Sequence, residues 1–449
     1  MFSDLGALSP LDGRYYNSAK ELNTYFSEAA LMQYRIYVEV EYLLALSKQK
    51  EIRKRLRIND NEQSELRKLY QSFDLNAAKE IKEIETKINH DVKAIEYYIQ
   101  NKTRRSLHPW IHFALTSEDV NNISYSLMWK HALEEIYLPY ASSLQSKLLN
   151  LIREHRKSPM LSLTHGQPAT PTTFGKEIRV FYNRIERQIV KLKKGALLAK
   201  MSGATGTWSA HNIAFASVDW FKFTSKFVMS LGLKPNLVTT QIEPHDSIAE
   251  SYQNVLRLNL ILKDLCQDMW LYISRGIISQ KKLGGEVGSS TMPHKVNPIQ
   301  FENAEGNIGI SNALLSHMSQ KLPISRMQRD LTDSTVLRNQ GIALGYSLVS
   351  IKSILKGVSR ISLNLDRTMD ELNKHWEVLG EAIQTMLRRE GLHDAYERLK
   401  NLTRGENIDN QLLKKFIKDL DLSKSHKKRL LSLSPQKYIG LSTRIADRM

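Results

Sequence analysis

Hydrophobic positions recur every three or four residues through most of the chain, which is the spacing that lines one face of an α-helix. Strand-type alternation is scarce. One segment, residues 247–275, contains neither Gly nor Pro, and its 29 residues predict a helix about 44 Å long. The sequence therefore predicts an all-α fold with a long central helical bundle. The other periodic segments are residues 84–99, 116–151, 174–192, 299–322 and 336–355.

Changes in this pattern divide the chain into three predicted domains. Residues 1–111 open with a turn at Asp12-Gly13 and continue as charged helical segments, which predicts an N-terminal helical domain. Residues 112–364 contain the long periodic segments and predict the bundle. From residue 365 to residue 449 the pattern breaks into shorter helices, which predicts a small C-terminal helical domain.

Residues 284–298, within the predicted bundle domain, cannot form a core element. They read Gly-Gly-Glu-Val-Gly-Ser-Ser-Thr-Met-Pro-His-Lys-Val-Asn-Pro. Gly is conformationally loose and Pro lacks an N–H, so the segment is predicted to be a loop. It could offer backbone N–H groups, hydroxyls and one lysine to an anion. By composition alone, a linker or a solvated lid is the more common explanation of such a stretch.

Three shorter polar segments also interrupt the helical pattern. Thr116 with Asp119 three residues later forms a capping box, a sufficient structural explanation, although helix N-terminal N–H groups can also hold an anion. His165 stands in a turn with two following prolines, where a structural role stays open. Residues 89–91, Asn-His-Asp, lie partly off the apolar face of residues 84–99, and an exposed polar patch is the alternative.

Charge and cysteine content restrict the class of protein. The chain has 449 residues, with 64 Lys and Arg against 47 Asp and Glu, a net charge of +17. The charges are dispersed and no nucleic-acid-binding motif accompanies them, so we expect no nucleic-acid partner; a basic surface would help to attract a polyanionic small molecule. The only cysteine, Cys266, lies in a helical pattern, which predicts a buried structural thiol and a reducing compartment.

No segment predicts export or membrane insertion. The N-terminal residues lack the basic and apolar regions of a signal peptide, and no window approaches eighteen uncharged apolar residues. We therefore expect a soluble cytoplasmic protein.

The order of residues in the 284–298 loop resembles a known signature. Gly288-Ser289-Ser290-x-Met292-Pro293-x-Lys295-x-Asn297-Pro298 is similar to the signature loop of the fumarase/aspartase superfamily, whose members cleave a C–N or C–O bond and release fumarate. The segments at residues 12–15, 116–119 and 164–168 follow in the order of the superfamily, so the resemblance covers essentially the whole chain.

Within the superfamily, the chain most resembles the adenylosuccinate lyase family. The features that point there are Pro293-His294-Lys295, residues 240–246 and residues 326–338. The resemblance implies a purine-pathway enzyme that releases fumarate from adenylosuccinate, giving AMP, and from the succinyl-carboxamide imidazole ribotide (SAICAR), giving its carboxamide (AICAR). Another fumarate-releasing lyase of the superfamily, such as argininosuccinate lyase, is the alternative.

The resemblance also implies roles for individual residues. Ser289 would be the general base, with its alkoxide stabilised by the glycine-rich backbone and Lys295, and His165 the general acid. The succinyl part would be held by Ser290, Lys295, Val296 (through its backbone) and Asn297. Nucleotide and phosphate contacts would come from Arg14, Tyr15, Arg329, Ser334, Thr335, Val336, Leu337 and Arg338. Base, ribose and succinyl contacts would come from Asn89, His90, Asp91, Thr116, Ser117, Gln241 and Asn303.

The resemblance implies no metal and no cofactor. It does imply a homotetramer of D2 symmetry, in which each site draws residues from three chains. The expected partners are therefore small nucleotide substrates and further copies of the chain.

Overall fold

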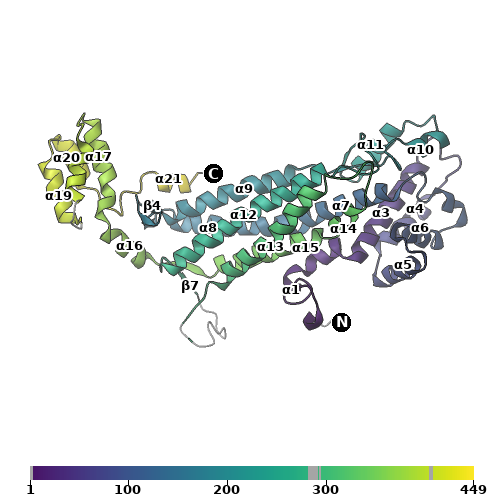
Figure 1. Cartoon of the computed structure of the whole chain (residues 1–449), viewed down its shortest axis with the longest axis horizontal. Coiled ribbons are helices and arrows are strands. Elements are labelled where there is room, and N and C mark those ends of the chain that lie inside the picture. The colour runs from purple at the N-terminus through teal and green to yellow at the C-terminus, as the bar shows by residue number, and fades with distance from the viewer. Residues whose placement is uncertain (1–3, 282–291, 293–294, 404–407, 449) are drawn as a thin grey trace. The chain divides into compact units, whose positions relative to one another are not determined.

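The computed structural model describes residues 4–281, 292, 295–403 and 408–448 (Figure 1). Helices dominate them, which confirms the all-α prediction. The α-helices are α1 (Tyr16–Ala19), α2 (Asn23–Phe26), α3 (Glu28–Ser47), α4 (Asp60–Gln71), α5 (Leu75–Ile88), α6 (Asp91–Asn101), α7 (Ser117–Ala132), α8 (Leu138–His155), α9 (Phe174–Lys194), α10 (Ser209–Ala214), α11 (Trp220–Ser230), α12 (Asp246–Ser274), α13 (Ile299–Lys321), α14 (Thr332–Leu337), α15 (Gln340–Val358), α16 (Leu365–Lys374), α17 (Gly380–Arg389), α18 (Ala395–Thr403), α19 (Asn410–Asp419), α20 (Lys424–Leu431) and α21 (Ser442–Ala446).

Short elements connect these helices. Four two-stranded pairings, β1 with β4, β2 with β3, β5 with β6 and β7 with β8, involve only two or three residues per strand. The strands are β1 (Pro159–Met160), β2 (Leu163–Thr164), β3 (Gln167–Pro168), β4 (Thr172–Thr173), β5 (Leu198–Ala199), β6 (Lys234–Pro235), β7 (Ile278–Gln280) and β8 (Ile361–Leu363). The 3₁₀ segments are η1 (Asp4–Gly6), η2 (Lys20–Leu22), η3 (Arg105–Trp110) and η5 (Trp376–Leu379), and η4 (Leu133–Tyr137) is a π-helical turn between α7 and α8.

The chain forms two compact units, and each boundary between them falls inside a long helix. The first unit is Met1–Ala141, Gln188–Leu260 and Gly306–Lys352; the second is Ser142–Arg187, Ile261–Glu305 and Ser353–Met449. The predicted division into domains 1–111, 112–364 and 365–449 stays a prediction.

The long helices have their predicted bounds to within a few residues. α12 has 29 residues, as predicted, and starts one residue earlier than expected. Cys266, on α12, is buried, as predicted, and burial raises the pKa of its thiol. The predicted apolar face of α9 is buried, including Phe174, Ile178 and Ile185. A continuous hydrophobic stripe is therefore sufficient to predict these helices.

Two predicted helices are interrupted, and both predictions were wrong in this respect. The periodic pattern of residues 84–99 is divided between α5 and α6, because Asn89 adopts a left-handed conformation (φ 52°) that ends α5. The pattern of residues 336–355 belongs to the short helix α14 and to α15, which begins at Gln340. Residues 332–358 are long and apolar enough to span a membrane by composition, but 67% of their most apolar window is buried in the protein, as in a core helix.

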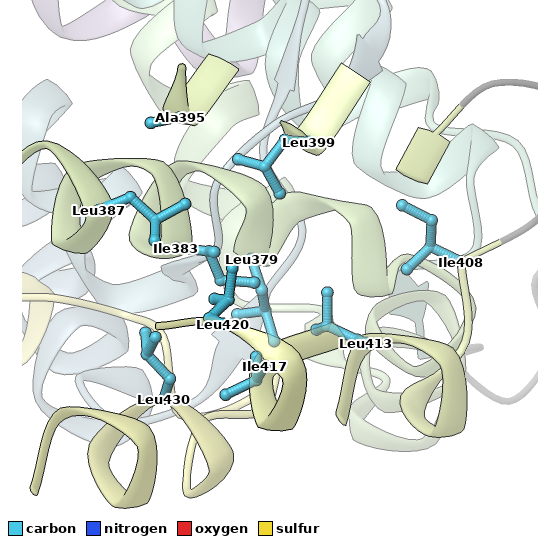
Figure 2. Close-up of a cluster of buried hydrophobic side chains, with 10 residues drawn as sticks. All are labelled: Leu379, Ile383, Leu387, Ala395, Leu399, Ile408, Leu413, Ile417, Leu420 and Leu430. Carbon is cyan, nitrogen blue, oxygen red and sulfur yellow. The ribbon is translucent and has the colours of Figure 1, made fainter. Parts of the chain in front are cut away.

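The second unit contains a separate hydrophobic cluster formed by the short C-terminal helices (Figure 2). Leu387 on α17, Leu413 and Ile417 on α19, and Leu430 on α20 are all less than 4% exposed. Burying each such side chain contributes about 1.5–3 kcal/mol. Figure 1 shows α17, α19 and α20 close together, and the buried cluster that they share therefore holds these helices together.

Candidate active site

His165 lies at the tip of a two-residue hairpin in the second unit. β2 and β3 pair antiparallel, with Thr164 opposite Gln167. His165 and Gly166 form the turn, both with positive φ (54° and 74°). Two successive positive φ values suit the tight turns that join hairpin strands, although a non-glycine residue adopts them rarely. The structure confirms the predicted non-helical turn and leaves the His165 ring exposed.

In the first unit, the Asn89-His90-Asp91 segment forms the break between α5 and α6. His90 caps α6, because its Nδ1 accepts a hydrogen bond from the backbone N–H of Lys93 at 3.1 Å. Asp91 Oδ2 accepts from Arg35 Nη2 at 2.8 Å and from Arg338 Nη2 at 3.4 Å. Burial opposes ionisation of Asp91, but the two arginines lower its pKa below the usual value.

These contacts bring two predicted site residues, Asp91 and Arg338, together. Asp91 and Arg338 are separated by 247 positions in sequence and form an ion pair. Arg338 and Leu337 also line a pocket of about 250 Å³, which Tyr125 and Met128 of α7 close on another side. The pocket therefore lies beside an arginine that is 49% exposed in its side chain and could meet an anionic ligand.

Thr116 and Ser117 are fixed by the start of α7. Asp119 Oδ2 accepts a hydrogen bond from the backbone N–H of Thr116 at 2.9 Å, as the capping box predicts. Asp119 Oδ1 also accepts from the N–H of Ser202 at 2.9 Å and lies 2.7 Å from Nζ of Lys200. Lys200 Nζ in turn donates to the carbonyl oxygen of Gln241 at 2.8 Å. The pair of Asp119 and Lys200 therefore joins the start of α7 to two loops, one that contains Ser202 and one that contains Gln241.

The two loops also touch each other directly. Gly206 has φ 78°, and a Cβ at this position would lie 2.1 Å from the carbonyl oxygen of Thr239. Only glycine fits such an approach. The side-chain amide of Gln241 donates to the carbonyl oxygen of Ala204 at 3.0 Å, so Gln241 is held at both its backbone and its side chain.

Arg329 lies against a buried cluster of Glu118, Asp333 and His245. Its Nη2 is 3.3 Å from Glu118 Oε2 and 3.9 Å from Asp333 Oδ1, and its Nη1 donates to Gln241 Oε1 at 3.4 Å. His245 Nε2 is 3.8 Å from Asp333 Oδ2. Burial raises the pKa of Glu118 to about 7, and Asp333 adds to the increase while Arg329 and His245 oppose it.

This cluster is not internally satisfied. Within the described part of the chain, no hydrogen-bond partner reaches Glu118 Oε1, Asp333 Oδ2, His245 Nε2 or Arg329 Nε. An unpaired buried polar atom costs about 1–3 kcal/mol of stability, so such a group is expected to have a further partner or a function. His245 also has φ 65°, a conformation that non-glycine residues adopt rarely.

Among the residues that the structure describes, Glu118, His245 and Asp333 also form a group that could hold a metal ion. One ligand atom from each of Glu118, His245 and Asp333 lies within 4.8 Å of the others. The guanidinium of Arg329, however, already places a positive charge against both carboxylates. The two carboxylates therefore suit the guanidinium of Arg329 better than a metal ion as an additional cation.

The remaining predicted residues are distributed over both units. Arg14 is exposed, and Tyr15 packs against a small core of Leu11, Ala19, Tyr346 and Val349. Asn303 is on α13, which belongs to the second unit. Residues 295–297 precede α13 and belong to the same unit. Ser334, Thr335, Val336 and Leu337 lie on α14, in the first unit.

The signature loop is only partly described. Ser289 and Ser290, the predicted base and its neighbour, lie outside the described residues. Lys295 is exposed, and its backbone N–H donates to the carbonyl oxygen of Met292 at 3.0 Å. The carbonyl oxygen of Val296 accepts from Gln280 Nε2 at 3.2 Å.

Glu118, His245, Asp333 and Lys200 were not among the site residues predicted from the sequence. Three of them stand beside a residue or segment that the resemblance indicated: Glu118 follows Ser117, His245 lies in the 240–246 segment, and Asp333 precedes Ser334. Lys200 has no such neighbour. Their convergence depends on side chains from distant segments, which no local pattern shows.

Comparison with known proteins assigns the chain to a family. Residues 13–310 match a family model described as Lyase, and residues 325–439 match one described as Adenylosuccinate lyase C-terminal. An adenylosuccinate lyase of Legionella pneumophila is 48% identical over 446 residues, with 98% of each chain covered. One of Escherichia coli (strain K12) is 47% identical over 452 residues, with 100% of this chain and 99% of that protein covered.

Solved structures share the fold. A fumarate lyase from Mesorhizobium sp. BNC1 superposes with a TM-score of 0.74 at 17% identity, covering 95% of this chain and 96% of that one. The 3-carboxy-cis,cis-muconate lactonizing enzyme from Pseudomonas putida does so with a TM-score of 0.74 at 19% identity, covering 97% of both. The full-length relatives support adenylosuccinate lyase and not argininosuccinate lyase. The chain belongs to the adenylosuccinate lyase family.

Proposed function

We propose that this lyase releases fumarate from adenylosuccinate, giving AMP, and from SAICAR, giving AICAR, in cytoplasmic purine nucleotide synthesis. The observation that carries the proposal is the identity of 47% over 452 residues with a named adenylosuccinate lyase, together with the match of the C-terminal region. Both substrates have a succinyl group on nitrogen, so one site can perform the same elimination on both.

The proposed reaction is a β-elimination. Ser289, as alkoxide, takes a proton from the carbon beside a carboxylate; the electron pair forms the double bond of fumarate, and the C–N bond breaks. His165 donates a proton to the departing nitrogen. Charge accumulates on a carboxylate that is already negative, so preorganised N–H donors and the Lys295 ammonium would stabilise the transition state.

The remaining site residues would bind the nucleotide. Arg329 and Arg338 are partly exposed cations whose guanidinium groups are held by Glu118 and Asp91. Such a fork of N–H donors suits a phosphate. The amide of Gln241 and the helix start at Thr116 and Ser117 would contact the base, ribose or succinyl group.

We further propose a homotetramer in which neighbouring subunits complete each site. His165 stands exposed at a hairpin tip. Apolar side chains are exposed on the long helices: Val180 and Val190 on α9, Leu260 and Leu271 on α12, and Ile310 on α13 are between 42% and 51% exposed. Packing against other copies would bury them.

Purified protein incubated with adenylosuccinate tests the function directly. We expect fumarate and AMP in equal amounts, measured by ultraviolet absorbance and chromatography, and a parallel release from SAICAR. Argininosuccinate is the control substrate and should yield no fumarate. Fumarate from argininosuccinate but not from adenylosuccinate would contradict the proposal.

A further inference from the structure

We propose that Glu118 is a positioning residue: with Asp333 and His245 it orients the guanidinium of Arg329, and through it the amide of Gln241, toward the phosphate-bearing part of the substrate. This inference rests on the proposed function. Glu118 would act only through Arg329 and would not itself touch the substrate.

The contacts of Arg329 come from three separate segments of the first unit. Glu118 is on α7, Gln241 lies in the loop before α12, and Asp333 is on α14. A planar guanidinium with partners on several sides has little rotational freedom. The side chain of Glu118 is 2% exposed and that of Arg329 is 19% exposed, so a buried anchor holds a cation that still reaches the surface.

The geometry leaves Arg329 available for a stronger partner. A bidentate arginine–carboxylate pair has N–O distances of about 2.7–2.9 Å. The carboxylates of Glu118 and Asp333 lie instead at 3.3 and 3.9 Å from Nη2, and no described residue hydrogen bonds to Nε. The cluster therefore fixes the direction of the guanidinium without engaging its full donor capacity.

His245 completes the cluster from another side. Its backbone N–H donates to Glu243 Oε2 at 2.7 Å, which holds the residue in its left-handed conformation. Its ring then lies 3.8 Å from Asp333 and faces the same carboxylates as Arg329. A cluster with only a packing role would be expected to satisfy its polar atoms, and this one leaves an unpaired atom on each of its four members.

The test is a double-mutant cycle on Glu118 and Arg329 in the full-length protein. Glu118→Gln keeps the size of the side chain and an oxygen acceptor, but replaces the carboxyl group that faces the guanidinium with a neutral amide. We expect it to raise the KM for adenylosuccinate about tenfold and to change kcat by less than about threefold. Arg329→Met should raise the KM further, and Glu118→Gln should have no additional effect on KM in that background.

Glu39→Gln is the matched control. Glu39 is also a buried carboxylate of the first unit, but it contacts His112. We expect this variant to lower stability and to leave the KM unchanged. Thermal unfolding of each variant separates a folding defect from a binding defect.

Two outcomes would overturn the inference. A KM effect of Glu118→Gln that persists in the Arg329→Met background would show that Glu118 acts independently of the arginine. A stoichiometric divalent metal in the purified protein, detected by elemental analysis, would show that a metal ion is the partner of the carboxylates. Fumarate release by the parent protein is measured first, so that failure of the proposed function is recognised separately.

Discussion

Lys200 Nζ lies 2.7 Å from Oδ1 of Asp119, and the two side chains are 0% and 1% exposed. Removing one partner of such a pair leaves an uncompensated charge in the protein interior. Without the lysine, Asp119 would keep only the backbone N–H groups of Thr116, Ser202 and Gly203 as partners, and these carry no net charge. This pair is therefore both a stability determinant and the link between the start of α7 and the Gln241 loop.

We expect Lys200→Met to destabilise the protein by about 3–5 kcal/mol, because Asp119 would be left charged and buried. Thermal and urea unfolding at fixed protein concentration measure the loss. The double variant Lys200→Met/Asp119→Asn should recover part of it. Lys68→Met is the control: it breaks an exposed pair with Glu65 and should cost less than about 1 kcal/mol. Equal losses for the two lysine variants would contradict the assignment.

A second prediction concerns pH and the pair formed by His112 and Glu39. His112 Nδ1 lies 2.5 Å from Glu39 Oε1. Burial opposes protonation, but the adjacent Glu39, with Glu96 and Asp119, raises the pKa of His112 to about 9 from 6.5. Because the folded state binds this proton more tightly, the pair stabilises the protein fully below pH 6.5 and loses its effect as the pH rises through about 9.

We therefore expect the free energy of unfolding to fall between pH 6.5 and 9 by up to about 3 kcal/mol more in the parent than in His112→Asn. Asparagine tolerates the left-handed conformation of residue 112 (φ 59°). His393→Asn, at an exposed histidine, is the control and should follow the parent. Identical slopes for the parent and His112→Asn would show that the pair does not titrate in this range.

The helices show which parts of the fold could be predicted from the sequence and which could not. The long helices were predictable because an uninterrupted apolar stripe specifies a helix locally, most clearly in α12, which contains neither Gly nor Pro. The break at Asn89 was missed because one left-handed residue ends α5 without disturbing the three-and-four spacing of the apolar side chains. The sequence signal was present in the polar run Asn89-His90-Asp91, which supplies a helix end and a helix start.

The candidate site could also be predicted only in part. Its residues were named through resemblance to a family, and the structure adds the contacts between them, such as Asp91 with Arg338 and Arg329 with Gln241. The buried carboxylate of Glu118 was missed, because a glutamate at a helix start predicts only a favourable interaction with the helix dipole. Its meeting with His245 and Asp333 depends on tertiary structure.

The proposed base and acid make a third prediction. Ser289→Ala and His165→Ala should each lower kcat by at least about 10²–10⁴-fold, for adenylosuccinate and for SAICAR alike, while circular dichroism stays unchanged. Ser279→Ala, at an exposed serine that precedes the signature loop in the sequence, is the control and should keep full activity. Activity of Ser289→Ala within tenfold of the parent would exclude its role as base. If His165→Ala retained one of the two activities, a different acid would serve that substrate.

The charge of Lys295 makes a fourth prediction. Lys295→Met keeps a long flexible side chain but removes the ammonium beside the developing carboxylate charge. We expect kcat to fall about 10²–10³-fold, the usual effect of removing one such stabilising group. Lys281→Met, at another exposed lysine close to the loop, should have little effect on kcat. Normal turnover by Lys295→Met would show that size, and not charge, matters at this position.

The last prediction tests whether subunits share the site. If His165 and Ser289 of one site come from different chains, the inactive His165→Ala and Ser289→Ala proteins can complement each other. Unfolded and refolded together, they should regain activity, because random mixing leaves about one site in four with both residues intact. Each mutant refolded alone is the control and should stay inactive. A mass tag on one mutant verifies that mixed tetramers formed; mixed tetramers without activity would mean that the two residues meet within one chain.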